Sequence, residues 1–308
     1  MVFLLLLPEV GAQDQRPRQT QANYPPAMAH ASAEVYKTIG DIKLNLYVFR
    51  PAEHKASDRR PAIVFFFGGG WTSGSPQQFQ RQCEYFASRG LVALAADYRV
   101  ASRHQVKAVS CVADAKSAVR WVRAHAGQLG IDPDKIVASG GSAGGHLAAC
   151  TGTIAGFDEA NEDTSVSSRP NAMLLFNPAV VLAPVDGKLP RRDPDKFRDR
   201  MGIEPKSISP YHHVKSGAPP TLILHGKADA VVPYQTVEWF AAAMTKAGNR
   251  CELVGYEGAG HGFFNFGQGE NKAFATTLER ADRFLVSLGY LRGEPTVERF
   301  LQQQTSAD

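Results

Sequence analysis

Apolar and polar positions alternate along the chain in patterns typical of strands and helices. Residues 33–40 and 41–50 alternate apolar with polar side chains, which predicts an antiparallel pair with one exposed face. Residues 61–69 and 91–99 are almost continuously apolar, as expected of strands that are covered on both faces. Four further strands are expected at residues 134–142, 171–178, 221–229 and 251–258.

Segments with helical periodicity lie between the expected strands. Phe79, Cys83 and Phe86 share one face of a helix expected within residues 75–90, and residues 109–130 carry the clearest apolar stripe. Three more helices are expected at residues 143–153, 233–249 and 272–291. Strands that alternate with helices predict an α/β fold, in which a mostly parallel sheet carries helices on both faces.

The pattern indicates a single domain with two long connections. The domain spans residues 31–290, and residues 291–308 form a polar tail without an expected element. Residues 155–170 and 179–220 exceed ordinary loop lengths. Ligands of open α/β sheets bind outside the carboxyl ends of the strands. We therefore expect both connections to form pocket walls or a partial lid, with residues 179–217 as the lid insertion.

The composition and the first residues of the chain indicate which binding partners and which cellular location to expect. The 308 residues are 44% hydrophobic and carry a net charge of +4 without a Lys/Arg block, which argues against nucleic-acid partners. The start, MVFLLLLPEVGAQDQ, resembles the end of a secretory signal, so residues 1–30 are interpreted as a signal-peptide remnant and mobile leader. A secreted or periplasmic location is expected; the alternative is a disordered apolar tail. No stretch is long enough to predict stable membrane insertion.

Four cysteines are present, none with metal-ligand spacing, so no metal site is expected. Cys83 and Cys111 lie near the starts of two successive expected helices and are the best candidates for a disulfide. Four buried free thiols are the alternative.

Ser142 is the candidate nucleophile. Residues 140–144 read Gly-Gly-Ser-Ala-Gly, which fits G-x-S-x-G between an expected strand and an expected helix. Small residues around the serine allow a tight turn that lifts the hydroxyl clear of the sheet, and the helix start supplies free N–H groups. A merely flexible turn is the alternative, which the rest of the chain must exclude.

A serine hydroxyl needs a base, and the base needs an acid. His261 lies in a glycine-rich loop after the last expected strand, and Asp229 lies at the end of the preceding one. The order Ser142, Asp229, His261 is that of the α/β-hydrolase triad. His225 and His146 are expected to have structural or hydrogen-bonding roles instead.

The glycines 68–70 lie at the end of the strand expected within residues 61–69 and suit an oxyanion hole. The N–H groups of Gly69, Gly70 and Ala143 are the expected donors, and a glycine hinge is the alternative. No phosphate-binding glycine motif is present, and no cofactor is expected.

Five motifs carry a family resemblance over roughly residues 30–290. They are Phe67-Gly68-Gly69-Gly70-Trp71, Asp97-Tyr98-Arg99, residues 140–145, His225-Gly226-x-x-Asp229-x-x-Val232-Pro233 and Gly260-His261-Gly262. The chain resembles the α/β-hydrolase serine esterases and is similar to bacterial acetylxylan-esterase-like and hormone-sensitive-lipase-like carboxylesterases. The resemblance implies an eight-stranded sheet with one antiparallel strand, no cofactor and an acyl-enzyme route.

Two positions depart from the family patterns. Phe67 replaces the histidine of H-G-G-G, and Gly141 replaces the acidic residue of G-D-S-A-G. Both departures favour hydrolases of sugar acetates and small esters. We expect a short-chain esterase, acting through Ser142 on acetyl esters of small molecules or carbohydrates. The alternatives are a general small-ester carboxylesterase or lipase, a prolyl-oligopeptidase-like peptidase and a non-catalytic ligand-binding protein. The oligomeric state is not predicted.

Overall fold

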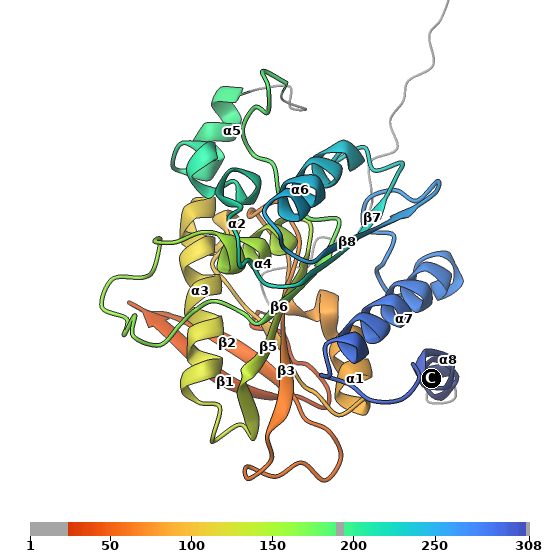
Figure 1. Cartoon of the computed structure of the whole chain (residues 1–308). Helices are drawn as coiled ribbons and strands as arrows, with labels where there is room; N and C mark the ends of the chain where they lie inside the picture. The colour runs from red at the N-terminus through yellow and green to blue at the C-terminus, as the bar shows by residue number, and fades with distance from the viewer. Residues whose placement is uncertain (1–23, 189–193, 306–308) are drawn as a thin grey trace, which may run out of the picture.

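One eight-stranded sheet organises the part of the chain that the computed structural model describes, residues 24–188 and 194–305 (Figure 1). The strands are β1 (Ser32–Ile39), β2 (Ile42–Phe49), β3 (Arg60–Phe66), β4 (Val92–Ala96), β5 (Ile131–Gly141), β6 (Ala172–Phe176), β7 (Thr221–Gly226) and β8 (Cys251–Tyr256). Most of the expected leader, up to residue 23, lies outside the described residues, as do residues 189–193 of the expected lid insertion.

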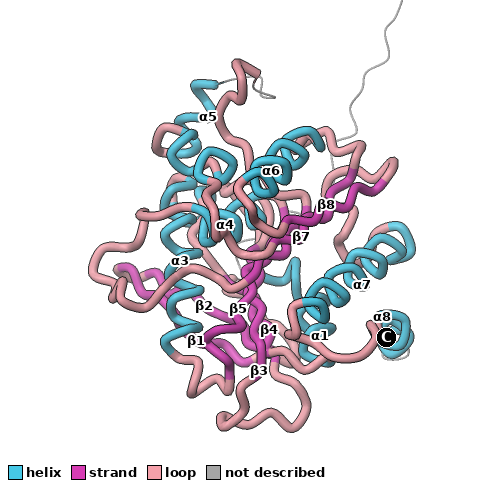
Figure 2. The backbone as a smooth tube through the Cα atoms, viewed as in Figure 1, coloured by secondary structure: helices cyan, strands magenta, loops and turns pink. Residues whose placement is uncertain are grey.

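The sheet order is β1-β2-β4-β3-β5-β6-β7-β8, and β2 runs opposite to the other seven strands. Figure 2 shows the sheet in magenta, running through the molecule between the helices. The predicted mostly parallel eight-stranded sheet is therefore confirmed. In the register, Phe66 pairs with Gly140, and Phe176 pairs with both Gly141 and Leu224. The carboxyl ends of β3, β5, β6 and β7 are thus level with one another.

Helices cover both faces of the sheet (Figure 1). One face carries α3 (Ala108–Ala124), α4 (Ala143–Thr153) and α6 (Tyr234–Lys246), and the other carries α1 (Gln80–Ser88), α7 (Lys272–Ser287) and α8 (Val297–Thr305). The alternation of β3 explains this arrangement, because Val64 and Phe66 point to the first layer while Ile63 and Phe65 point to the second. All four side chains are buried.

Shorter helices lie in the connections. They are α2 (Ala101–His104), α5 (Pro194–Met201) and 3-10 helices at Pro76–Phe79, Pro205–Ile208, Pro210–His213 and Gly269–Asn271. The described part of the expected lid insertion includes α5, which lies beside α2 in Figure 1. The ring of Phe197 in α5 packs edge-on against Trp71 at 6.4 Å between ring centroids.

The polar tail contains a helix that the sequence analysis missed. Val297 and Phe300 are buried, and the ring of Phe300 packs edge-on against Tyr85 of α1 at 5.5 Å. Two apolar residues three positions apart anchor α8, too few to stand out in a polar segment.

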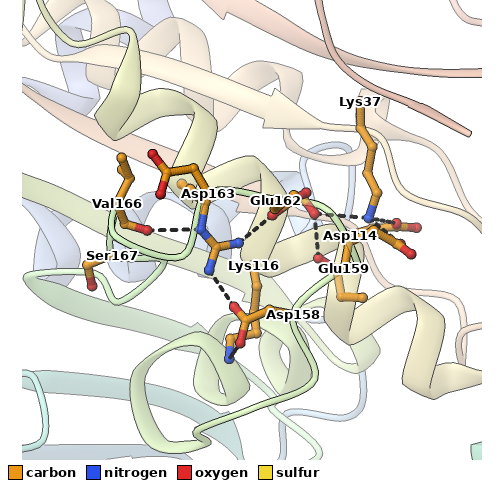
Figure 3. Close-up of polar contacts among 12 residues, drawn as sticks. Lys37, Asp114, Lys116, Asp158, Glu159, Glu162, Asp163, Val166 and Ser167 are labelled. Atoms are coloured by element: carbon orange, nitrogen blue, oxygen red, sulfur yellow. Dashed lines mark hydrogen bonds and ion pairs between the residues drawn. The ribbon is translucent and has the colours of Figure 1, made fainter.

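Residues 155–170, which were expected to form a pocket wall or partial lid, line a pocket of about 430 Å³ at the C-terminal end of α4, and Ser142 is not part of its lining. Lys116 and Arg120 of α3 bind the carboxylate of Asp158, and Arg120 also binds Glu162 and the carbonyl of Val166. Figure 3 shows these carboxylates directed at α3. The segment follows the C-terminal end of α4, about 16 Å along the helix from Ser142, and cations hold it along α3.

The candidate disulfide between Cys83 and Cys111 does not form. All four cysteines are free, and the sheet separates Cys83 from Cys111, which belong to the apolar layers on opposite faces. Burial raises the pKa of both thiols. The sequence pattern predicts no helix between the two that hold these cysteines, but α1 and α3 lie on opposite faces of the sheet.

Candidate active site

Five adjacent parallel strands end at one edge of the sheet, and each supplies a candidate residue. Gly68 follows β3 closely, Ser142 follows β5, Asn177 follows β6, Asp229 follows β7 and His261 follows β8. Because these strands are neighbours in the sheet, residues that are far apart in sequence come together there.

Ser142 lies on a strained turn between β5 and α4. Its φ is 56° and its ψ is −118°, a conformation that non-glycine residues rarely adopt. The Ser142 amide donates to the carbonyl of Phe176 at 2.9 Å, which ties the turn to β6. A Cβ on Gly144 would lie 2.0 Å from the carbonyl oxygen of Phe66, so only glycine fits there. β5 and α4 can therefore approach each other closely, and the tight turn between them presents the Ser142 hydroxyl.

The structure brings the three predicted residues of the triad together. His261 Nε2 lies 2.9 Å from Ser142 Oγ, and His261 Nδ1 lies 2.7 Å from Asp229 Oδ2. Because an ionised carboxylate only accepts, Nδ1 carries the proton and Nε2 is left to accept from the serine hydroxyl. This is the arrangement in which a serine can be deprotonated.

Asp229 sits in a network of donors. Its Oδ1 accepts from the amides of Val231 and Val232 at 2.8 and 2.9 Å, and its Oδ2 accepts from Nδ2 of Asn177 at 2.5 Å. Burial raises the pKa of this carboxyl, but hydrogen bonds from His225, His261 and the Val232 amide outweigh it and hold the pKa far below its usual value. Asp229 therefore stays ionised and can stabilise a protonated His261.

Two further residues position the carboxylate. His225 is buried, with Nε2 at 2.8 Å from the carbonyl of Val232 and 3.3 Å from Asp229 Oδ2. Asn177 was missed by the sequence analysis. In the sequence, the only sign of its role was a polar side chain directly after a buried strand. In the structure, Asn177 has a φ of 42°, a conformation that asparagine adopts more readily than most residues.

The loop after β3 offers free N–H groups. Among the described residues, the amides of Gly69 and Gly70 donate no hydrogen bond, and Ala143 is the first residue of α4, where an amide has no acceptor within the helix. A Cβ on Gly68 would lie 3.4 Å from Ser142 Cβ, so the loop runs beside the serine. Gly69 has a φ of 123°, and a Cβ there would lie 2.1 Å from the carbonyl oxygen of Ser73.

Phe67 supports this loop differently from the family's histidine. Its ring stacks on Tyr98 at 4.0 Å between centroids, and the Tyr98 hydroxyl donates to the Phe67 carbonyl at 2.7 Å. The Gly68 amide donates to Gln78 Oε1 at 2.6 Å, and Gln78 Nε2 donates to Asn265 Oδ1 at 2.9 Å. A stacked aromatic pair and the partly buried amide of Gln78 replace the imidazole.

His146 lies behind the loop rather than at the serine. Trp71 Nε1 donates to His146 Nδ1 at 3.2 Å, so His146 Nε2 donates to the carbonyl of Ile208 at 2.7 Å. The buried imidazole thus links the loop after β3 to the connection that contains α5.

The described residues include no group of three His, Cys, Asp or Glu side chains placed to hold a metal ion. None of the helices in the described ranges is long and apolar enough to cross a bilayer.

Comparisons with known proteins agree with this geometry. Esterase LipC of Mycobacterium tuberculosis is 33% identical over 230 residues, which cover 66% of this chain and 53% of that protein. Acetylxylan esterase of Xylanibacter ruminicola is 28% identical over 238 residues, covering 74% of this chain and 44% of that one. The chain spans about half the length of LipC and of two other curated mycobacterial esterases that it matches.

Among solved structures, the apo form of Thermogutta terrifontis esterase 2 is similar, with a TM-score of 0.85 and 59% sequence identity over 88% of this chain and 99% of that one. Residues 63–265 match the alpha/beta hydrolase fold family, which is most of the predicted domain. The chain belongs to the alpha/beta hydrolase fold family, as its motifs indicated.

Proposed function

We propose that the chain is a serine carboxylesterase that forms an acyl-enzyme on Ser142. The observation that carries this proposal is the continuous relay from Ser142 Oγ through His261 to Asp229, with separations of 2.9 and 2.7 Å. His261 takes the serine proton as the hydroxyl attacks the ester carbonyl, and it returns that proton to the departing alcohol. Water repeats the sequence and releases the acid.

The amides of Gly69, Gly70 and Ala143 stabilise the oxyanion in both steps. They are free of other acceptors among the described residues and flank the serine. Donors fixed before the reaction need no reorganisation, and one such donor is typically worth about 3 kcal/mol of the barrier.

Short acyl groups, acetyl first, are the proposed substrates, with carbohydrate acetates as one natural source. Support comes from the similarity to an acetylxylan esterase and from solved forms of T. terrifontis esterase 2 with propionate or butyrate bound. That esterase is also known phosphonylated by sarin.

The test combines labelling with hydrolysis. The wild type should react with a fluorophosphonate probe and hydrolyse 4-nitrophenyl acetate and butyrate faster than octanoate. Ser142→Ala should abolish both, whereas Ser73→Ala, which removes an exposed serine on the neighbouring loop, should retain both. Labelling that survives Ser142→Ala would overturn the proposal.

Acetate release from acetylated xylan tests the carbohydrate source, and cleavage of a prolyl peptide would favour the peptidase alternative. The secreted or periplasmic location stays a prediction.

A further inference from the structure

A pocket of about 690 Å³ lies between α5 and the segment that joins α2 to α3. Its apolar part is formed by Trp71, Ala101 and Val106. Its charged part consists of three cations and two carboxylates, Lys107, Lys196, Arg200, Asp195 and Asp199. The pocket thus combines an aromatic wall with a small excess of positive charge.

Arg200 is the cation that this pocket leaves available. Lys107 is paired with Asp199 at 2.7 Å, and the neighbouring Arg198 is paired with Glu204 at 3.2 Å. Arg200 is exposed and forms no ion pair or hydrogen bond with any residue that the structure describes. Its guanidinium therefore keeps all of its donors free for a ligand.

The guanidinium also faces the loop of free amides. A Cβ built on Gly70 would lie 3.8 Å from Nη1 of Arg200, and one built on Gly68 would lie 3.4 Å from Ser142 Cβ. Gly68 and Gly70 are separated by two Cα steps, which is at most about 7.6 Å. Ser142 Cβ and Nη1 of Arg200 are therefore at most about 18 Å apart, and an extended ester with a charged end can bridge a span of this order along Trp71.

We propose that this pocket binds the carboxylate of an anionic ester and that Arg200 is a specificity-determining residue. The inference rests on the proposed esterase activity and adds a substrate class to it. A guanidinium presents parallel N–H donors that match the two oxygens of a carboxylate, and Trp71 with Val106 offers an apolar surface to the body of the ligand. The ester bond lies at Ser142 while the carboxylate binds at Arg200.

The test compares each acid with its own methyl ester. 4-Acetoxybenzoate and methyl 4-acetoxybenzoate place the charge on the alcohol half, and 4-nitrophenyl hydrogen glutarate and its methyl ester place it on the acyl half. The measured quantity is the ratio of kcat/KM for the acid to that for the methyl ester. In one of the two pairs, Arg200→Gln should lower this ratio about tenfold, mainly through KM, and Arg200→Glu should lower it further. Added NaCl should lower the wild-type ratio and leave that of Arg200→Gln almost unchanged.

Arg198→Gln is the matched control, since it removes a neighbouring arginine of α5 that does not line the pocket and should leave the ratio unchanged. If Arg200→Gln and Arg198→Gln give the same ratios as the wild type in both pairs, the carboxylate subsite is wrong while the esterase proposal stands. If the wild type hydrolyses neither member of either pair and Ser142 is not labelled, the proposed function itself fails.

Discussion

Nδ2 of Asn177 lies 2.5 Å from Oδ2 of Asp229, the same oxygen that is 2.7 Å from His261 Nδ1. Asn177 is fully buried at the end of β6, between the strands that lead to Ser142 and to Asp229. Its amide therefore holds the carboxylate in the orientation that His261 requires. An asparagine outside the triad is thus part of the geometry on which the relay depends.

We expect Asn177→Gly to lower kcat for short esters about tenfold, with little change in KM. Glycine tolerates the positive φ of this position, so the variant removes the amide without straining the backbone. A lost hydrogen bond to a charged group costs about 1.5–3 kcal/mol, here in the state where His261 is protonated. Steady-state kinetics measure the change, and urea denaturation checks that the variant is folded. A wild-type kcat would show that the amide does not orient Asp229.

Gly141 is explained by an aromatic side chain rather than by the turn. A Cβ at this position would lie 2.5 Å from Cζ of Phe264 and 3.2 Å from Cζ of Phe79, and both rings are fully buried. Gly141→Ala should therefore lower the free energy of unfolding by about 2 kcal/mol. In Gly141→Ala/Phe264→Leu, the smaller side chain makes room, so the double variant should be at least about 1 kcal/mol more stable than the sum of the single changes. Strictly additive values in urea denaturation would contradict this explanation.

The sequence was enough to find the triad because each of its members lies at or shortly after the end of a predicted strand, within a recognisable motif. Parallel strands bring their carboxyl ends together, so the positions in sequence translated into positions in space. The same argument could not find Asn177, because a single asparagine after a strand carries no motif. Gln78 was hidden for another reason: its bond to the Gly68 amide joins residues ten positions apart through a turn that has no periodic pattern.

The errors arose where chain order was taken as a guide to space beyond the sheet edge. Cys83 and Cys111 lie near the starts of α1 and α3, yet the sheet lies between them. Residues 155–170 follow the helix that starts at Ser142, but that helix carries the chain away from the site. Right-handed crossovers and helix length determine these placements, and neither is visible in a local pattern of apolar residues.

Arg103 holds the far end of the loop of free amides. Its Nη1 donates to the carbonyl of Gly74 at 2.8 Å, its Nη2 donates to the Tyr24 hydroxyl at 3.0 Å, and its guanidinium lies 3.8 Å from the centroid of the Tyr24 ring. Arg103→Met should lower kcat about fivefold, because the oxyanion donors act chiefly in the transition state.

The matched variant for this prediction is Tyr24→Phe. It keeps the ring beneath the guanidinium and removes only the hydroxyl, so its kcat should fall less than that of Arg103→Met. Both are measured with 4-nitrophenyl acetate, together with KM. A change confined to KM in Arg103→Met would show that the arginine acts on substrate binding and not on the loop.

The carboxylates that tie residues 158–162 to α3 make part of the stability depend on pH (Figure 3). Partial burial raises the pKa of Asp158, but bonds and charges from Arg120 and Lys116 outweigh it and lower the pKa below its usual value. A carboxyl whose pKa is lower in the folded than in the unfolded state stabilises the fold above the unfolded pKa of about 3.9, and this stabilisation is lost as the pH falls through the folded value.

Asp158→Asn should therefore lower the free energy of unfolding by about 1–2 kcal/mol at pH 7, because it leaves the nearly buried cations of Lys116 and Arg120 with fewer partners. The difference from the wild type should shrink as the pH falls below about 4 towards the lowered pKa of folded Asp158, because protonation then removes the same charge. Urea denaturation at several pH values measures both effects. Asp186→Asn is the control, since Asp186 is exposed and forms no ion pair within the described residues, and it should change stability by less than about 0.5 kcal/mol. A loss in Asp158→Asn that is independent of pH would mean that the side chain stabilises the segment by packing and not by charge.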